Sequence, residues 1–141
     1  MDIWSKSKRS EVMSRIHGRN TKPELLVRSV LHRAGFRFSL RRKDLPGRPD
    51  IVLPKYRTVI FVNGCFWHQH RGCKEASRPK TRRKFWADKL DGNVCRDQRN
   101  YRALRKLGWR VIVVWECEVE KKPERVLAMT QKKVDAPFCQ D

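Results

Sequence analysis

The order of apolar and helical patterns along this chain predicts an α/β fold with a mixed central β-sheet flanked by helices. Two uninterrupted apolar runs, at 58–62 and 111–114, are typical of strands buried on both faces of a sheet. Helical patterns precede the first run, separate the two runs and follow the second. At 141 residues the chain can form one domain with its own core. We therefore expect a single domain at 21–141, preceded by a basic arm at 1–20.

The first helix is predicted to begin at Thr21. Thr21 suits the N-cap, Pro23 suits the first turn, and Glu24 completes a capping box. An apolar stripe follows on one helix face, and Gly35 is a natural C-terminal stop. Beyond it, apolar and polar residues alternate, which predicts a half-buried strand at 36–40.

Two turns and two strands are predicted next. A Pro- and Gly-containing turn at 45–49 leads into a strand at 50–53, and a second turn at 54–57 leads into the apolar run at 58–62. Because that run is too apolar for an edge strand, we place it in the centre of the sheet. The long segment 63–80 has little pattern of its own, which a bound metal would explain.

Two further helices are predicted between the apolar runs. Thr81 and Asn93 are suitable N-caps for them, and Gly108 ends the second. A buried strand is expected at 109–115, and a final helix is expected after Pro123. The resulting order is helix, strands, helices, strand and helix.

The charge of the chain favours a polyanionic partner. Lys and Arg number 34 against 15 Asp and Glu, which gives a formal charge of +19, and nucleic acid is the polyanion we expect. Residues 1–8 contain no apolar signal core, and no stretch approaches the roughly 20 apolar residues of a membrane span. We predict a cytoplasmic, nucleoid-associated protein with no membrane contact. In that reducing compartment, clustered cysteines are more often metal ligands than disulfides.

Cysteines and histidines crowd the segment after the first apolar run. Cys65, His68, His70 and Cys73 are ligands of the kind that Zn²⁺ binds in tetrahedral geometry, and Cys117 can reach them if the two apolar strands are neighbours. A closed structural site is better served by Cys65, His70, Cys73 and Cys117, which leaves His68 for chemistry. The alternative is a set of buried or free cysteines and surface histidines. The remaining two cysteines are predicted to be free thiols: Cys95 and Cys139.

Asp50 is the candidate for a second, harder metal. It begins a strand after a proline turn, a position that ordinary turn chemistry also explains. Mg²⁺ needs few protein oxygens, so Asp50 and a main-chain carbonyl near Val62 would suffice for a phosphodiester-cleaving site. Glu24 is first a capping residue, but its carboxylate could also bond a metal-bound water if that helix start faces the sheet end.

Aromatic residues near the metal cluster are candidate wedges. Phe66 and Trp67 lie in a loop between potential ligands, and an apolar side chain presented this way can enter a DNA base step. Trp86 is a third candidate, although with Phe85 on a helix face it fits core packing equally well. The basic residues of 71–84 would hold nearby phosphates.

Four motifs carry a resemblance to a known family. They are LPGRPD at 45–50, VIFVNGCFWH at 59–68, GWRV at 108–111 and VWEC at 114–117. In this order, over roughly residues 8–120, they closely resemble the very-short-patch (Vsr) mismatch repair endonucleases. The resemblance implies a restriction-endonuclease-like core, a structural zinc and a Mg²⁺-dependent active site. It also implies nicking on the 5′ side of the thymine in a T:G mismatch, which arises when 5-methylcytosine deaminates.

The resemblance also assigns roles to residues. Asp50 would bind the catalytic metal with the Val62 carbonyl, Glu24 would support hydrated metal, and His68 would be the general base. The zinc ligands would be Cys65, His70, Cys73 and Cys117. The intercalating residues would be Phe66, Trp67, Trp86 and Met13. Two departures stand out: Asn63 occupies a place where some members carry histidine, and the Cys65–Cys73 interval is one residue longer, through Arg71 and Gly72.

The expected activity is therefore that of a Mg²⁺-dependent, strand-specific DNA endonuclease acting as a monomer on duplex DNA with a T:G mismatch. Mismatch-repair proteins are candidate partners. One alternative is a zinc-stabilised DNA-binding module without catalysis, which needs neither Asp50 nor His68. Another is a restriction enzyme that cuts both strands of unmismatched DNA. No spare apolar helix face suggests the dimer that such enzymes usually form.

Overall fold

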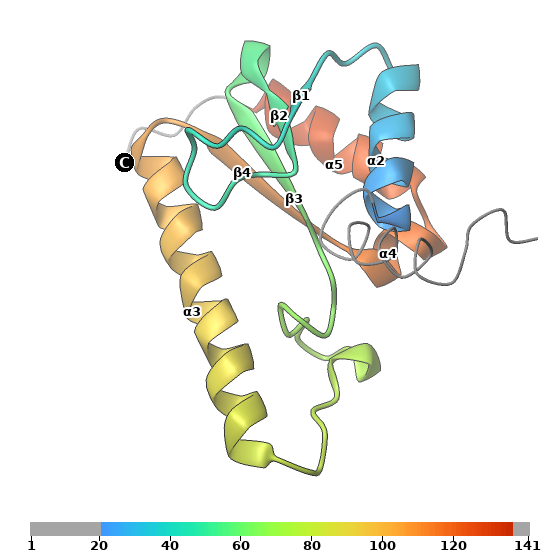
Figure 1. The fold of residues 1–141 in the computed structure, drawn as a ribbon. Coiled ribbons are helices and arrows are strands. Elements are labelled where there is room, and N and C mark those ends of the chain that lie inside the picture. The colour runs from blue at the N-terminus through green and yellow to red at the C-terminus, as the bar shows by residue number, and fades with distance from the viewer. Residues whose placement is uncertain (1–20, 137–141) are drawn as a thin grey trace, which may run out of the picture.

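The computed structural model describes residues 21–136 and contains one four-stranded sheet flanked by helices (Figure 1). The strands, in the order in which they lie in the sheet, are β1 (Ser39–Leu40), β2 (Ile51–Leu53), β3 (Thr58–Asn63) and β4 (Arg110–Trp115). β1, β2 and β3 pair antiparallel, whereas β3 and β4 pair parallel. The predicted mixed α/β sheet is confirmed. The predicted arm at 1–20, with Met13, and the predicted free thiol Cys139 lie outside the described residues.

β3 lies in the interior of the sheet, as its apolar composition predicts. It pairs with β2 on one side and β4 on the other. The parallel register aligns Asn63 with Trp115, so both strands end at the same edge of the sheet. Cys65 and Cys117 each follow two residues later and therefore leave the sheet at the same place.

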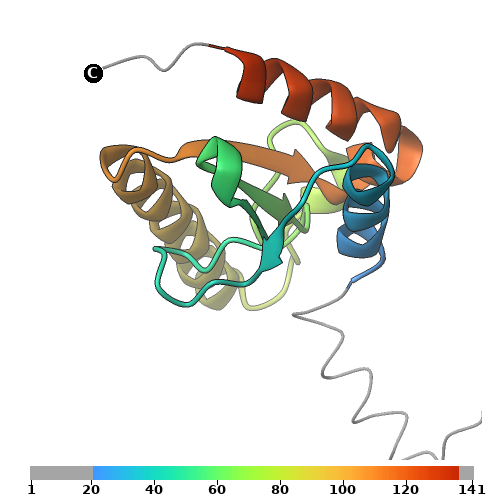
Figure 2. The ribbon, with the colours of Figure 1, turned by 90° about the horizontal axis from the view of Figure 1, so that it is seen from above.

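Helices cover both faces of this sheet (Figure 2). They are α2 (Lys22–Arg33), α3 (Arg83–Lys106), α4 (Glu116–Lys121) and α5 (Glu124–Asp135). Short 3-10 turns occur at η1 (Pro54–Tyr56) and η2 (Lys74–Ala76). On one face, residues of α2, α4 and α5 pack against Ile60 and Ile112, and on the other face α3 packs against Val59 and Val111. Neighbouring residues of a strand point to opposite faces, and helices cover both faces here. Consecutive positions of β3 and β4 are therefore apolar, which explains the two continuous apolar runs.

The beginning and end of α2 agree with the predicted signals. The Thr21 hydroxyl accepts a hydrogen bond from the Glu24 amide at 3.4 Å, and Pro23 lies in the first turn. Ala34 is the C-cap, and Gly35 follows with a φ of +89°, which glycine adopts without steric cost.

The predicted pair of helices between the strands was wrong. One uninterrupted helix, α3, spans 24 residues, and its N-cap is Arg82, with left-handed backbone, rather than Thr81. Asn93 lies inside α3 and does not begin a second helix, because its side-chain amide donates to the Trp67 carbonyl at 3.0 Å instead of capping. Gly92 before it is tolerated in the helix interior at a cost of about 1 kcal/mol.

Two other elements differ from the prediction. The strand expected at 36–40 is shorter, at Ser39–Leu40, and Phe36 and Phe38 before it pack against the core instead of continuing the strand. The helix α4 was not predicted, because β4 runs directly into it and its N-cap position holds Trp115, which provides no capping hydrogen bond. The final helix begins one residue after Pro123, as expected.

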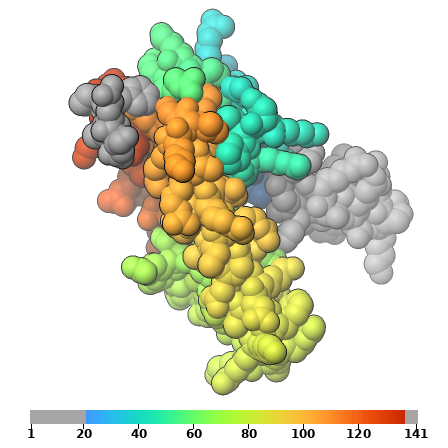
Figure 3. Space-filling model, turned by 90° about the vertical axis from the view of Figure 1, so that its left-hand side faces the viewer, coloured from blue at the N-terminus to red at the C-terminus, as the bar shows by residue number. Residues whose placement is uncertain are grey.

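The N-terminal half of α3 and the loop before it project from the body of the molecule as one lobe (Figures 1 and 3). None of the helices in the described part of the chain is long and apolar enough to cross a membrane. The lobe lies at the edge where β3 and β4 end, so the sheet leads directly into the segment that carries the predicted ligands and wedge residues.

Candidate active site and metal centre

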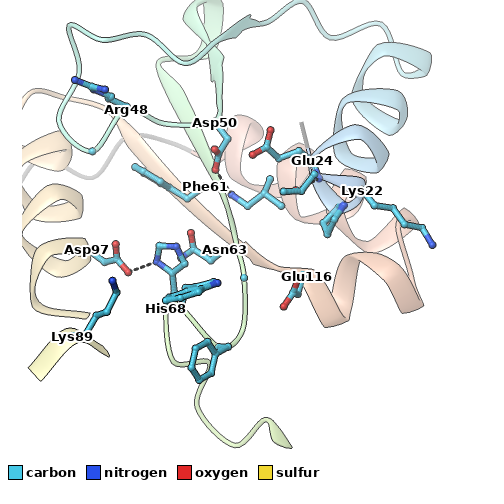
Figure 4. Close-up of a pocket in the computed structure, with 17 residues that line it drawn as sticks. Lys22, Glu24, Arg48, Asp50, Phe61, Asn63, His68, Lys89, Asp97 and Glu116 are labelled. Carbon is cyan, nitrogen blue, oxygen red and sulfur yellow. Dashed lines mark hydrogen bonds and ion pairs between the residues drawn. The ribbon is translucent and has the colours of Figure 1, made fainter. Parts of the chain in front are cut away.

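A cleft of about 750 Å³ opens at the end of β3, between the start of α2 and the lobe (Figure 4). Asp50, His68 and Glu24 all line it, although they come from three separate segments of the chain. The predicted catalytic side chains are therefore brought to one site.

Asp50 is fixed by the neighbouring strand. Its Oδ2 accepts a hydrogen bond from the Val62 amide at 2.8 Å. The observed contact between the two residues is thus made by the Val62 N–H, while the predicted metal contact of the Val62 carbonyl stays a prediction.

The surroundings of Asp50 disfavour its charged form. Burial, together with the nearby Glu24, raises the pKa of the Asp50 carboxyl to about 7, and the Val62 amide and Arg41 partly oppose this shift. Glu24 itself is 3% exposed, and its Oε2 accepts from Arg28 at 3.0 Å and from Arg41 at 2.8 Å. Two acidic side chains therefore line the same cleft, and both neighbouring arginines hydrogen-bond to Glu24.

This donor set suits a hard divalent cation. Mg²⁺ takes carboxylate oxygens and keeps several water ligands, which an open cleft accommodates. A bound cation would favour the ionised form of Asp50 and offset its repulsion by Glu24. Asp50 and Glu24 therefore fit the predicted magnesium site on the basis of their chemistry.

His68 faces the same cleft and is paired with a carboxylate. Its Nδ1 lies 2.6 Å from Oδ2 of Asp97 on α3. When Nδ1–H donates to this carboxylate, Nε2 is left unprotonated and able to accept a proton from water. The pair therefore has the arrangement of a general base held in one tautomer by an acidic neighbour.

Sequence reasoning missed Asp97. The signal that could have found it is the spacing of Asn93, Asp97 and Tyr101, which repeats every four residues along one face of α3. Each of these side chains contacts the site: Asn93 bonds Trp67, Asp97 bonds His68, and Tyr101 bonds Asn63. The predicted break at Asn93 concealed this continuous face.

Asn63 has a packing role in this structure. It is 3% exposed, and its Nδ2 donates to the Tyr101 hydroxyl at 2.9 Å. Burial raises the pKa of Tyr101 to about 12, so its phenol stays protonated at neutral pH. The contact joins the end of β3 to α3 beneath the cleft.

The four predicted zinc ligands lie together beside the cleft. The ligand atoms of Cys65, His70, Cys73 and Cys117 are all within 4.8 Å of one another. His70 Nδ1 lies 3.6 Å from Cys65 Sγ and 3.5 Å from Cys117 Sγ, so this nitrogen faces the sulfurs. Three cysteines and one histidine at these separations can hold a metal ion in tetrahedral geometry. Cys95 is an exposed free thiol, as expected.

Neighbouring residues orient the cluster. The His70 ring stacks on Trp115 with centroids 4.3 Å apart, and His70 Nε2 lies 3.8 Å from Glu118. The Cys65 amide donates to Glu116 at 3.0 Å. Burial raises the pKa of the Cys65 thiol to about 12, and the adjacent thiols act in the same direction. A bound cation would reverse this preference, because metal-bound cysteine is a thiolate.

The predicted wedge residues form one aromatic cluster. Ring centroids of Phe66 and Trp67 are 5.1 Å apart, and Trp86 lies 5.6 Å and 6.2 Å from them. All three side chains are half-buried. Trp86 therefore belongs with the loop aromatics rather than with the core of the sheet.

Polar contacts fix the loop that carries this cluster. Gln69 has a left-handed φ of +52°, and its side chain donates to the Phe66 carbonyl at 2.6 Å. Arg78 donates to Gln69 at 2.9 Å and pairs with Asp91 on α3 at 2.5 Å. Gly72, within the longer Cys65–Cys73 interval, has a φ of +74° and open space around it, so it can accommodate the additional residue.

Comparison with known proteins places this site in context. The family model described as DNA mismatch endonuclease Vsr matches residues 1–75. A type II nicking enzyme of Xanthomonas oryzae, V.XorIIP, is 52% identical over 118 residues, covering 84% of this chain and 86% of the relative. The nicking enzyme V.NmeAIP of Neisseria meningitidis is 46% identical over 96% of this chain and 98% of its own length. The DNA mismatch endonuclease Vsr of Escherichia coli K12 is 46% identical over 98% of this chain and 88% of its own length.

Proposed function

Because this chain belongs to the Vsr family of DNA mismatch endonucleases, we propose that it nicks one strand of duplex DNA on the 5′ side of the thymine in a T:G mismatch. The resemblance seen in the sequence motifs is thereby confirmed at the level of the family. The observation that best supports the proposed reaction is the meeting of Asp50 and the His68–Asp97 pair in one cleft, beside an aromatic cluster. We further propose that the sheet and its helices form a restriction-endonuclease-like core.

In the proposed reaction, His68 acts as the general base. Its Nε2 accepts a proton from water as the water oxygen attacks phosphorus and the bond from phosphorus to the leaving oxygen breaks. Asp97 holds the imidazole in the tautomer that leaves Nε2 free and stabilises the imidazolium that forms. Asp97 is thus a positioning residue, and His68 is the catalytic one.

Asp50 and the Val62 carbonyl would hold Mg²⁺, and Glu24 would bond a water of the hydrated ion. The ion would stabilise negative charge on the attacking and leaving oxygens of the displacement. Before it binds, Arg41 and Arg28 offset the charge of Glu24, and the Val62 amide holds Asp50 in place. The protein therefore contributes a preformed pair of carboxylates rather than one assembled by the ion.

We propose that Cys65, His70, Cys73 and Cys117 bind a structural Zn²⁺. The loop between Cys65 and His70 carries Phe66, Trp67 and His68. A metal at the cluster would therefore fix the position of the two aromatic side chains relative to the general base His68. Phe66, Trp67 and Trp86, with Met13 from the arm, would enter the stack beside the mismatch. The net charge of +19 supplies sequence-independent affinity for the phosphates.

The context we propose is that of a monomer acting on chromosomal DNA in the cytoplasm, with mismatch-repair proteins as candidate partners. The relatives named as nicking enzymes favour single-strand cleavage over the double-strand cut of a restriction enzyme. The non-catalytic DNA-binding module is disfavoured because it gives no role to the contact between His68 and Asp97.

A nicking assay tests the proposal. End-labelled duplexes carrying T:G or T:A in varied flanks are incubated with zinc-loaded protein, with and without Mg²⁺. Omission of Mg²⁺ is preferable to EDTA, because EDTA would also remove zinc. A single Mg²⁺-dependent nick 5′ of the mismatched thymine is expected, and it should be lost in Asp50→Ala. Binding without cleavage in every flank would contradict the proposal, and so would nicking by Asp50→Ala at the wild-type rate.

A further inference from the structure

Arg48 is an exposed arginine at the mouth of the cleft, two residues before Asp50. Its φ is +47°, a left-handed backbone conformation that is costly for a residue with a Cβ. The following residue is Pro49, which restricts the backbone of Arg48 further. Glycine would meet these requirements at lower cost, so the presence of arginine requires an explanation.

The turn that carries Arg48 is fixed at both ends. Leu45 and Pro49 are buried, and the Arg48 amide donates to the Leu45 carbonyl at 3.1 Å. Gly47 packs so closely on α3 that an added Cβ would lie 3.0 Å from Cβ of Asn100. The backbone of Arg48 is thus held in place by its neighbours, and its own side chain is not needed for that.

Within the part of the chain that the structure describes, the Arg48 guanidinium has no protein partner. Across residues 21–136, no hydrogen bond, ion pair or ring contact engages it, whereas the two arginines beside Glu24 are both paired with that carboxylate. Arg41, rather than Arg48, lowers the pKa of Asp50. The donors of this exposed side chain are therefore available at the edge of a site proposed to take a polyanion.

The position of Arg48 indicates which part of the polyanion it meets. In Figure 4, Arg48 and Glu24 lie on opposite sides of Asp50. A phosphate held at Asp50 and Glu24 for cleavage is therefore distinct from a phosphate that reaches Arg48. Successive phosphates of one strand provide such a second group, and the planar guanidinium matches it by two parallel hydrogen bonds.

We propose that Arg48 binds a non-scissile phosphate of the cut strand and thereby sets which phosphodiester lies at Asp50. This inference rests on the proposed nicking function and adds a substrate-positioning residue to it. The left-handed turn would serve to aim the guanidinium along the strand, which the same side chain could not do from an extended backbone.

Phosphate neutralisation tests the contact. A series of T:G duplexes carries one methylphosphonate at a time on the cut strand, and nicking is measured in a single turnover. For the wild type, one non-scissile position is expected to slow nicking roughly 10- to 100-fold, the value of a charged hydrogen bond. Arg48→Gly should show the same loss on unmodified DNA and no further loss at that position. Arg48→Lys should retain part of the rate, and Arg125→Ala, an exposed arginine on α5, should behave as wild type.

Stability measurements separate this role from a structural one. Arg48→Gly should melt at the wild-type temperature or higher, because glycine adopts the left-handed backbone without steric cost. A lower melting temperature with the rate loss would make Arg48 a structural turn residue and overturn the proposal. Equal methylphosphonate effects in wild type and Arg48→Gly would also overturn it. If the wild type nicks no duplex, the proposed function fails, and the same scan measured as binding affinity then decides the Arg48 contact alone.

Discussion

Replacing Asp50 by asparagine should stabilise the fold near neutral pH while removing activity. Burial and Glu24 raise the pKa of Asp50 from 3.8 to about 7. At pH values between these two numbers, the Asp50 carboxyl is therefore protonated in the folded protein and ionised in the unfolded chain. The free energy of unfolding of the wild type therefore falls as pH rises through this window. Asparagine keeps an acceptor for the Val62 amide and does not ionise.

The magnitude follows from the shift in pKa. One pKa unit corresponds to about 1.4 kcal/mol, so a shift of about 3 units gives at most about 4 kcal/mol when the window has been crossed. The stability difference between Asp50→Asn and wild type should be near zero below pH 4. It should grow by about 2 kcal/mol between pH 5.5 and pH 8.

Urea unfolding of zinc-loaded protein without Mg²⁺ measures this difference. Asp44→Asn is a matched control, because Asp44 is fully exposed and its hydrogen bond with Arg42 lowers its pKa. It should not show a stabilisation that grows with pH. Added Mg²⁺ at pH 8 should reduce the advantage of Asp50→Asn, because the ion binds only the wild-type carboxylate well. A difference that is constant from pH 5.5 to pH 8 would refute the reasoning about Asp50.

Three further outcomes are expected. Asp97→Asn should lower the single-turnover nicking rate roughly 10²- to 10⁴-fold with unchanged affinity for the mismatched duplex, and an unchanged rate would remove the pair with His68 from the mechanism. Cys65→Ser should lose bound zinc and melt at a lower temperature than Cys95→Ser, and a stable zinc-free protein with full activity would show that the cluster binds no structural metal. Trp67→Ala should weaken binding of the T:G duplex by about 1–3 kcal/mol and quench less of the signal of a fluorescent base beside the mismatch, whereas equal signals would show that Trp67 does not enter the stack.

The sheet and the metal cluster were predictable because local patterns specify both. An uninterrupted apolar run such as 58–62 is typical of a strand covered on both faces, and a second run at 111–114 was assumed to lie beside it. The parallel pairing of the two strands then brings Cys117 to the loop of Cys65, His70 and Cys73. One assumption about neighbouring strands was sufficient to assemble the proposed ligand set.

The acid and base partners were not predictable in the same way. The pairing of Glu24 with Arg41 joins residues 17 positions apart, and it depends on a left-handed backbone at Arg41 that nothing in the local sequence indicates. Asp97 could have been found only by reading α3 as one helix, but Asn93 carries the ordinary signal of a helix start. Tertiary contact overrides that signal, because the Asn93 amide is used by Trp67.

In the proposed function, the continuity of α3 would also connect recognition with reaction. Trp86 and Asp97 are 11 residues apart on the same helix, which corresponds to about 16 Å along its axis. Between them no proline interrupts the hydrogen bonds of the helix, and Gly92 leaves it continuous, so this part of α3 would act as a rod. If Trp86 enters a base step as proposed, a displacement there would be passed along the helix to Asp97 and, through the contact of Asp97 with His68, to the imidazole. Fidelity in such a protein would need no closing lid, because a base step that accepts the indole poorly would misalign the proton acceptor at the other end of the rod.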